Sequence, residues 1–189
     1  MPATKKPSRG KLYRTILIDP PWPEKGAGKI KRGADRHYAV MTPRDILRVI
    51  LSSGVFNPYP DAHLYLWTTN NYLPDALWLI DALGFKYKTC ITWAKNKIGL
   101  GQYFRGQTEH FLFAARGRGM RVRKMRTDKK DLSTLIEAEH VEDDQGKIIH
   151  SAKPEESYKL IEAASPAPRL EMFARRKRRG WTAWGDELR

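Results

Sequence analysis

The tetrapeptide Asp19-Pro20-Pro21-Trp22 places a carboxylate, two prolines and an indole at consecutive positions. The ionised carboxylate of Asp19 only accepts hydrogen bonds. The prolines donate none and keep the backbone extended, which is expected to leave the Pro20 carbonyl free as a second acceptor. Trp22 adds a wide aromatic face with little rotamer entropy to lose. Two acceptors beside a stacking platform suit a planar ring that bears an –NH2 group, such as the edge of adenine.

This set of groups predicts alkylation of the amine. An exocyclic amine on a purine is a poor nucleophile because its lone pair is delocalised into the ring. Acceptors that hold both N–H bonds favour a more tetrahedral nitrogen and direct its lone pair at an electrophile, here a cofactor's methyl sulfonium held in line. A base in a duplex must first be flipped out, and it is then predicted to stack on Trp22. An isolated Asp-Pro-Pro is more often a turn than a site, so its place in the fold matters.

The motif follows directly on residues 13–18, an almost continuous apolar run. Such a run, ended by prolines, is typical of a central strand buried on both faces. Ligands of open α/β sheets bind beyond the carboxyl ends of strands, so this position favours a site. Further strands are expected at residues 63–68, 85–94, 110–115, 169–174 and 181–184.

Three helices are expected between these strands. Thr42 is predicted to cap the first helix, with Pro43 at its first position. The third is predicted from Pro154, as its first residue, to Ala164. The apolar stripes of the first two helices are Ile46, Leu47, Ile50 and Leu51, and Leu73, Ala76, Leu77, Ile80 and Leu83. Alternating strands and helices predict an α/β fold with a mainly parallel, twisted sheet flanked by helices.

With 189 residues the chain has the length of one domain. Residues 1–11 are expected to form a flexible basic arm, and residues 12–189 a single domain. Residues 116–147 interrupt the alternation and are predicted to be an insertion at the rim of the sheet. Between residues 116 and 130 this insertion carries eight Lys and Arg residues against one Asp.

The composition excludes several classes of protein. The 35 Lys and Arg against 21 Asp and Glu leave a net charge of +14, which favours polyanionic partners. A lone Cys90 rules out an internal disulfide, a zinc ribbon and a CxxC redox pair, and the histidines lack metal-ligand spacing. No apolar run approaches the roughly 18 residues of a membrane span, and no secretory signal is recognised. A cytoplasmic protein is expected, nucleoid-associated in a bacterial or phage setting.

Seven further segments, in the order in which they occur, accompany the first motif. They are His37-Tyr38-Ala39-Val40-Met41-Thr42, 63–70 (HLYLWTTN), 91–95 (ITWAK), 108–110 (TEH), 151–156 (SAKPEE), 171–175 (EMFAR) and 185–188 (GDEL). Together with Asp19 to Trp22 they resemble the MT-A70 family, the S-adenosylmethionine-dependent adenine-N6 methyltransferases of RNA and DNA. The resemblance runs from about Tyr13 to Leu188, apart from residues 116–147. It implies a Rossmann-like methyltransferase fold in the permuted, β-type order, with the cofactor half at the C-terminal end.

The resemblance also implies roles for individual residues at the cofactor site. Lys153 would pair with the methionyl carboxylate of S-adenosylmethionine. The residues implied to hold its ribose and amino-acid portions are Arg175, beside Phe173, together with Asp186 and Glu187, while Asp19 and Pro20 border the cofactor as well as the amine. The chain departs from the family's pattern at Ala174, where Gly is usual, and at Asp186-Glu187, where Asn-Gln is usual.

Further residues are expected to contact the nucleic acid. Tyr38 is predicted to be a lid over the flipped base, and Asn70 and Lys95 lie in the matching segments. Trp67 is equally well explained as a core residue. Glu109 could position a base or simply close a strand, and the resemblance, which covers it, favours the site. The basic residues predicted to bind phosphates are Arg116, Arg118, Arg121, Arg123, Lys124 and Arg126. A solvated surface is the alternative explanation of this cluster.

The leading hypothesis is methylation of adenine N6 in DNA, and the same reaction on RNA is the first alternative. A non-catalytic nucleic-acid-binding subunit is the second, although such subunits are expected to lose the Asp or the prolines. Methylation of a protein side-chain amide fits less well, because Asp and Trp replace the Asn and Tyr of the related Asn-Pro-Pro-Tyr motif. A homodimer or a partner subunit is possible for so compact a chain.

Overall fold

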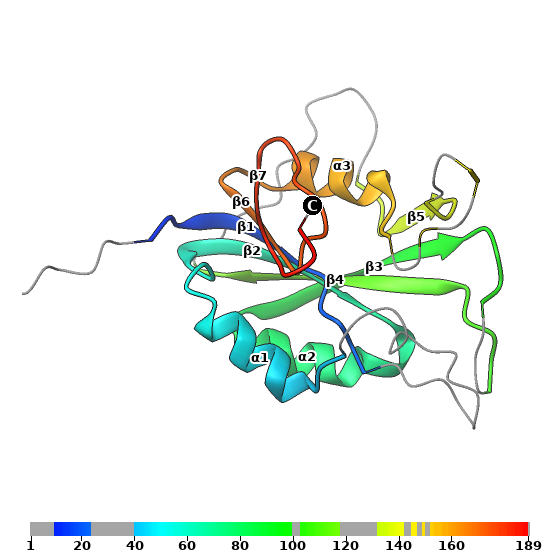
Figure 1. The fold of residues 1–189 in the computed structure, drawn as a ribbon, viewed down its shortest axis with the longest axis horizontal. Coiled ribbons are helices and arrows are strands. Elements are labelled where there is room, and N and C mark those ends of the chain that lie inside the picture. Colours follow the sequence, from blue (N-terminus) through cyan, green and yellow to red (C-terminus); the bar gives the residue numbers. More distant parts are fainter. Residues whose placement is uncertain are drawn as a thin grey trace, which may run out of the picture.

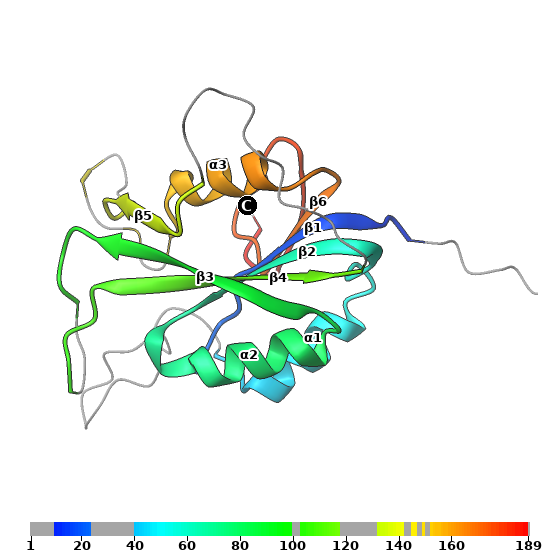
Figure 2. The same ribbon diagram turned by 180° about the vertical axis from the view of Figure 1, so that it is seen from behind.

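The computed structural model describes residues 10–23, 40–99, 103–117, 132–141, 145–146, 149 and 152–188. Within these residues a seven-stranded sheet has the order β5-β3-β4-β2-β1-β6-β7. Helices α1 and α2 cover one face of this sheet and α3 covers the other (Figure 1). The view from behind shows the same three layers (Figure 2). The strands are β1 (Tyr13–Ile18), β2 (Pro58–Thr68), β3 (Lys86–Lys95), β4 (Thr108–Arg116), β5 (Leu135–Ala138), β6 (Arg169–Met172) and β7 (Trp181–Trp184).

The sheet is mixed, with one strand reversed. Strand β1 pairs in parallel with β2 and β6, β6 pairs in parallel with β7, and β3 with β5. Strand β4 lies between β2 and β3 and is antiparallel to both. The expected mainly parallel sheet therefore holds for six of the seven strands. The sequence pattern did not predict the reversal of β4, which follows β3 without the helix that a parallel crossover needs.

Helix α1 begins where its local signals predict, but α1 and α2 bury fewer residues than their apolar stripes predict. Helix α1 (Pro43–Ser52) starts after Thr42, whose side chain accepts a hydrogen bond from the Asp45 amide. Ile46 and Ile50 are buried, whereas Leu51 of the predicted stripe is 59% exposed. The short 3-10 helix η2 (Asn70–Tyr72) leads into α2 (Leu73–Ala82), on which Leu77 is 43% exposed instead of buried. A helix that packs on a sheet buries only the residues that face the sheet, so residues at the margin of its apolar stripe stay exposed.

Several boundaries and one strand differ from the expectations. Strand β2 begins five residues before its expected start, and the ends of β3 and β4 are displaced by one or two residues. Helix α3 (Glu155–Ala164) begins one residue later than predicted, with Pro154 as its N-cap. Strand β6 ends at Met172, two residues before the predicted end. Strand β5 comes from the stretch 116–147 that was expected to be a rim insertion, and it extends the sheet by pairing with β3. Its four residues are too few for a periodic signal.

Each face of the sheet carries its own apolar cluster. Ile16 and Ile18 of β1 join the cluster beneath α1 and α2, whereas Leu17 joins the aromatic cluster beneath α3. Successive strand residues point to opposite faces, so the next residue after Ile18, Asp19, falls on the α3 side. No helix in the described part of the chain has the length and apolar character needed to cross a membrane.

Candidate active site

The reversed strand brings side chains from both halves of the chain to one edge of the sheet. Asp19 follows the carboxyl end of β1, and Lys95 is the last residue of β3. Because β4 runs the other way, its first residues lie at that same edge, with Ala94 opposite Thr108 and Trp93 opposite Glu109. This is the edge at which ligands of open α/β sheets bind.

Four charged side chains form a continuous series at this edge, which we call the charge chain: Asp19, Lys153, Glu109 and Lys95. Lys153 Nζ lies 2.9 Å from Asp19 Oδ2 and 3.5 Å from Glu109 Oε2. The other oxygen of Glu109 accepts a short hydrogen bond from Lys95 Nζ. The side chain of Lys153 is only 8% exposed, and alternating charges stabilise one another in such a partly dry environment.

The pair of Asp19 and Lys153 joins residues that are 134 positions apart in sequence. Lys153 lies just before α3, which packs over the face of the sheet to which Asp19 points. The carboxylate predicted to hold an amine and the lysine implied for the cofactor therefore meet at one point. Asp19 and Lys153 therefore place an anion and a cation side by side. This arrangement suits the neighbouring ammonium and carboxylate groups of an α-amino acid.

The two lysines of the charge chain each contact the face of an indole, Trp67 or Trp93. Lys153 Nζ lies 5.2 Å from the centre of the Trp67 ring, and Lys95 Nζ lies 5.0 Å from that of Trp93. The two rings meet edge to face, with centroids 6.3 Å apart. Such cation–π contacts stabilise lysines that have given up part of their hydration. Trp67 is thus a buried core residue and a support for Lys153 at the same time.

The pKa values of the two carboxylates that contact Lys153 are shifted in opposite directions from their usual values. Burial raises the pKa of Asp19, and the Lys153 ammonium only partly opposes this effect. Burial also acts to raise the pKa of Glu109, but Lys153 and Lys95 together outweigh it, and its pKa is lowered. Glu109 therefore stays ionised, whereas the charge of Asp19 depends on Lys153.

Trp22 lies on the opposite side of the sheet from Lys153. Its side chain is only 5% exposed and belongs to the cluster beneath α1 and α2. The ring stacks on Tyr72 at 5.5 Å and 12°, and its Nε1 donates to the Trp67 carbonyl at 2.9 Å. Trp22 thus fastens the motif to the end of β2. Stacking of a base on Trp22 stays a prediction, and in this packing Tyr72 covers one face of the ring.

The Pro20 carbonyl was expected to be free, but it accepts a hydrogen bond from the Trp22 amide at 2.9 Å. A carbonyl oxygen has two lone pairs, so one acceptor position remains. The amide of Met41 donates to the Pro21 carbonyl at 2.9 Å, which holds the start of the segment leading to α1 against the motif. The motif is therefore a fixed turn whose conformation is set by its own backbone and by Trp22.

A polar network that the sequence reasoning did not assign lies beside the charge chain. His110 Nε2 donates to Asn70 Oδ1 at 2.7 Å, and His110 Nδ1 accepts from Thr92 Oγ1 at 3.0 Å. Asn70 Nδ2 in turn donates to Thr108 Oγ1 at 3.1 Å. Burial lowers the pKa of His110. A neutral imidazole therefore links β3, β4 and η2; its position next to Glu109 was the available signal.

The C-terminal residues implied for the cofactor lie together after β6. Phe173 has a left-handed backbone, with φ of 59°, and its ring meets that of Trp184 edge to face at 5.8 Å. Arg175 Nε lies 3.5 Å from Glu187 Oε2. The Arg175 guanidinium is also close enough to act against the raised pKa of Asp19. Arg175 and Glu187 are thus paired with each other, and Asp186, the residue before Glu187, is exposed.

Glu171 of β6 is a buried carboxylate that the sequence reasoning left without a role. It is 7% exposed and accepts a hydrogen bond from the Tyr158 hydroxyl at 2.7 Å. Burial raises the pKa of Glu171, and the nearby Asp19 adds to the increase. The available signal was its position in the segment 171–175 that carries the resemblance.

Arg116 is placed away from this edge. It ends β4 opposite Ala62, and its guanidinium lies 5.6 Å from the centre of the Phe85 ring. Arg116 therefore lies away from the active site, because the antiparallel direction of β4 carries its last residue to the amino edge of the parallel strands, and its contact with nucleic acid stays a prediction. The remaining predicted contacts lie outside the described residues: Tyr38, Arg118, Arg121, Arg123, Lys124 and Arg126.

Comparison with known proteins agrees with this arrangement. Residues 13–187 match the model of the MT-A70 family. The chain is 28% identical over 198 residues to the type II methyltransferase M.MunI of a Mycoplasma species, which covers 94% of this chain and 78% of that protein.

Two fungal proteins are similar at the same level, both N6-methyladenosine RNA methyltransferases named MTA1. The protein of Pyricularia oryzae is 27% identical over 194 residues, and that of Cryphonectria parasitica is 28% identical over 191 residues. These matches cover 93% and 94% of this chain but only 47% and 52% of the fungal proteins, so the chain spans about half their length. Over nearly its whole length, this chain belongs to the MT-A70 family of adenine methyltransferases, whose members use S-adenosylmethionine as the methyl donor.

Proposed function

We propose that the chain transfers the methyl group of S-adenosylmethionine to the exocyclic N6 amine of adenine in DNA, with the base flipped out of the strand. The ion pair between Asp19 and Lys153 carries this proposal. It joins the residue suited to an aromatic amine and the residue suited to the donor's carboxylate, at the sheet edge where both ligands would have to meet.

The side chains at this edge fit S-adenosylmethionine. The donor's amino-acid end carries an ammonium and a carboxylate, which match the adjacent charges of Asp19 and Lys153. Arg175, Asp186 and Glu187 supply charged groups for the amino-acid portion and the ribose hydroxyls. The indole N–H of Trp67 is buried without a hydrogen-bond partner among the described residues, so a donor at this edge is still available to a ligand or a water. When bound, the donor would supply a methyl sulfonium.

The protein groups act by positioning and by handling a proton. Asp19 and the remaining lone pair of the Pro20 carbonyl would accept the two N–H bonds of the adenine amine. The bound donor, held by Asp19 and Lys153, would supply the methyl group to the amine nitrogen and would keep the electron pair of its carbon–sulfur bond. The methylated amine nitrogen would then carry an additional proton. The Asp19 oxygen that accepts its N–H bond would be placed to remove that proton. A pKa raised by burial makes Asp19 a better acceptor for that proton than an exposed carboxylate.

RNA is the second candidate, and two relatives named as RNA methyltransferases favour it. DNA is placed first because the chain covers 78% of the type II methyltransferase M.MunI but only 47% and 52% of the two RNA methyltransferases. The stacking of a base and its –NH2 group are the same in both nucleic acids, so the two differ in the backbone contacts.

The direct test is methyl transfer to matched DNA and RNA pools. The protein is incubated with isotopically labelled donor and with both pools, and the nucleosides are then separated by mass spectrometry. We expect labelled N6-methyladenine from the DNA pool. The Asp19→Ala variant should lose about a hundredfold or more in rate, whereas Asp81→Ala, an exposed aspartate on α2 paired with Lys86, should retain full activity. Full activity in Asp19→Ala, or label on another atom, would contradict the proposal.

A further inference from the structure

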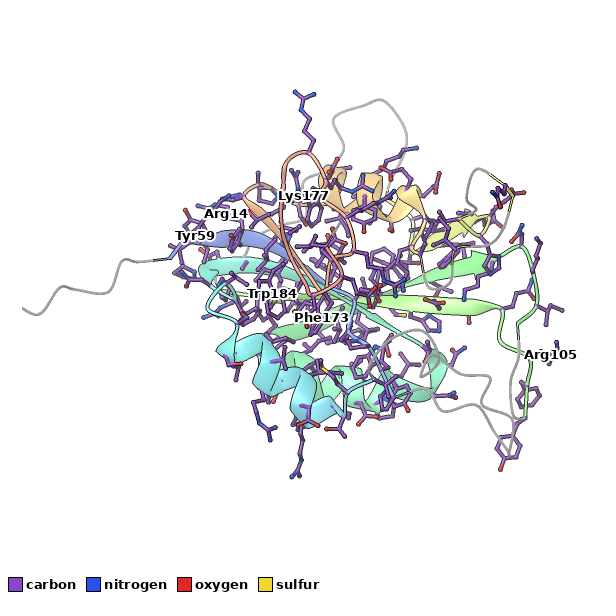
Figure 3. The ribbon with its side chains drawn as sticks, viewed as in Figure 1. Arg14, Tyr59, Arg105, Phe173, Lys177 and Trp184 are labelled. Carbon is purple, nitrogen blue, oxygen red and sulfur yellow. The ribbon has the colours of Figure 1, made fainter. Side chains whose placement is uncertain are left out.

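The connection between β3 and β4 carries two aromatic side chains that contact almost nothing. Tyr103 is 95% exposed and Phe104 is 91% exposed, and Ile98 on the other limb is 60% exposed. Scattered exposed apolar residues are ordinary, but two adjacent aromatic rings at the tip of a connection mark an interaction surface. Figure 3 shows Arg105, the next residue, beside this connection, beyond the ends of β3 and β4.

The base of the connection is held by hydrogen bonds that continue the β3–β4 ladder. The Lys95 amide donates to the Gln107 carbonyl at 2.9 Å, and the Gly99 amide donates to the Gly106 carbonyl at 2.7 Å. Arg105 Nε donates to the Gly99 carbonyl at 2.7 Å. The backbone approach is so close that a Cβ on Gly99 would lie 2.9 Å from the Gly106 oxygen. The two rings are therefore presented from an ordered support.

The charge around the rings selects the class of partner. Between Asn96 and Gln107 the sequence has two cations, Lys97 and Arg105, and no acidic residue. Exposed aromatic rings among cations, without acids, combine a stacking surface for bases with attraction for phosphates. A protein partner would need an acidic surface that also offers apolar contacts; a nucleic acid offers both features along its whole length.

The connection begins directly after Lys95, the last residue of β3 and a member of the charge chain. Lys95 pairs with Glu109, and Phe104 precedes the first residue of β4 by four positions. Four residues span at most about 13 Å, so the rings lie within about that distance of the start of β4, where Glu109 shares Lys153 with Asp19. A strand whose adenine reaches Asp19 therefore has neighbouring bases within reach of Tyr103 and Phe104.

Resting on the proposed function, we propose that Tyr103 and Phe104 form a base-stacking surface that holds the nucleic-acid strand beyond the target adenine, on one side of it. Single-stranded DNA and RNA share this chemistry, since every base has an aromatic face. The surface contributes to substrate affinity and leaves the chemical step unchanged.

The test compares the Tyr103→Ala/Phe104→Ala double variant with the wild-type chain. Binding of labelled DNA and RNA oligonucleotides that contain one adenine is measured by fluorescence anisotropy, and methylation rates are measured on the same strands. We expect the Kd and the KM to rise about 25-fold or more, from about fivefold for each ring. The kcat should stay within about twofold of the wild-type value, because no group near the reacting atoms is removed. The salt dependence of the Kd should keep its slope, because no phosphate contact is lost.

Tyr87→Ala is the matched control. Tyr87 is 45% exposed, and Lys86 and Lys88 flank it at the opposite end of β3. It is an exposed aromatic among cations but lies at the other edge of the sheet, so its removal should leave the Kd unchanged. The oligonucleotide is also shortened stepwise, first on one side of the adenine and then on the other. Shortening the side that reaches the rings should abolish the difference in Kd between the double variant and the wild type, whereas shortening the other side should leave that difference unchanged.

Three results would overturn the inference. One is a Kd of the double variant equal to that of the wild type. The second is an equal loss in Tyr87→Ala. The third is a smaller sedimentation coefficient of the double variant without nucleic acid, since the rings would then join two copies of the chain. A wild-type chain that binds oligonucleotides but methylates none would contradict the proposed function alone, because the anisotropy measurement still tests the stacking surface.

Discussion

Lys153 is the cation on which the electrostatics of the site depend, and Lys153→Met tests this directly. The substitution removes the ammonium but keeps an unbranched apolar stem over Trp67. It leaves Asp19 and Glu109 close together without the cation that they share. At an effective dielectric constant of 20, a charge pair 2.9 Å apart has a Coulomb energy of about 6 kcal/mol, but desolvation offsets much of it.

Removing one partner of a buried pair costs about 3–5 kcal/mol. The side chain of Asp19 is 25% exposed, so we expect the lower end, a loss of about 3 kcal/mol in the free energy of unfolding at pH 8. The control is Lys159→Met. Lys159 lies on α3, is 70% exposed and is 3.9 Å from Glu156, and a surface pair of this kind contributes at most about 1 kcal/mol.

The loss should depend on pH in a defined direction. Burial already raises the pKa of Asp19. Removal of Lys153 raises this pKa further and takes away one of the two cations that lower the pKa of Glu109. A carboxyl group whose pKa is raised in the folded state takes up a proton there before it does in the unfolded chain. The destabilisation is therefore full above the folded pKa and decreases as the pH falls toward the unfolded values of 3.8 and 4.5.

Urea unfolding of the two variants and the wild type at pH 8 and pH 5 measures both effects. We expect the difference between wild type and Lys153→Met to be smaller at pH 5 than at pH 8, with Lys159→Met close to wild type at both. An equal effect of the two substitutions, or a difference that grows on acidification, would refute the reasoning from the charge chain.

Two further substitutions probe the positions that hold the site in place. Trp22→Phe removes the hydrogen bond from Nε1 to the buried Trp67 carbonyl, so the free energy of unfolding in urea should fall by about 1–3 kcal/mol; a stability equal to wild type would show that this bond does not anchor the motif. Gly185→Ala places a Cβ 2.5 Å from the Ala174 carbonyl oxygen, where backbone atoms must move, and should cost about 2 kcal/mol or more in the same assay. Gly10→Ala is its control, because the nearest atom to that Cβ is 3.7 Å away, and similar losses in both variants would contradict the expected clash.

The sequence predicted the local features of the fold well. The strand before Asp19 was expected at residues 13–18 and is found there. The cap at Thr42 is confirmed by its hydrogen bond with the Asp45 amide. These signals are local: an apolar run, a capping side chain and a proline act within a few residues of one another. The order of the motifs also predicted the MT-A70 family, which the match over residues 13–187 confirms.

The sequence pattern could not predict the direction of β4. An apolar run shows that a strand is buried but not which way it runs, because direction depends on the length and path of the connection before it. The consequences are large. Reversal of β4 brings Glu109 to the active edge and carries Arg116 to the opposite one. The stretch 116–147 was expected to be an insertion, yet β5 within it joins the sheet.

The residue types alone determined which chemistry is feasible here: a carboxylate on a rigid turn, an indole, and an excess of cations. Only the tertiary structure decided how these residues are used. It buried Trp22 against Tyr72 on one side of the sheet and paired Asp19 with Lys153 on the other, across 134 positions of sequence. The physical reason is that charges interact through space. Lys153 meets both carboxylates because α3 and the reversed β4 converge on the end of β1, and that convergence belongs to the packed sheet and to no single segment of the chain.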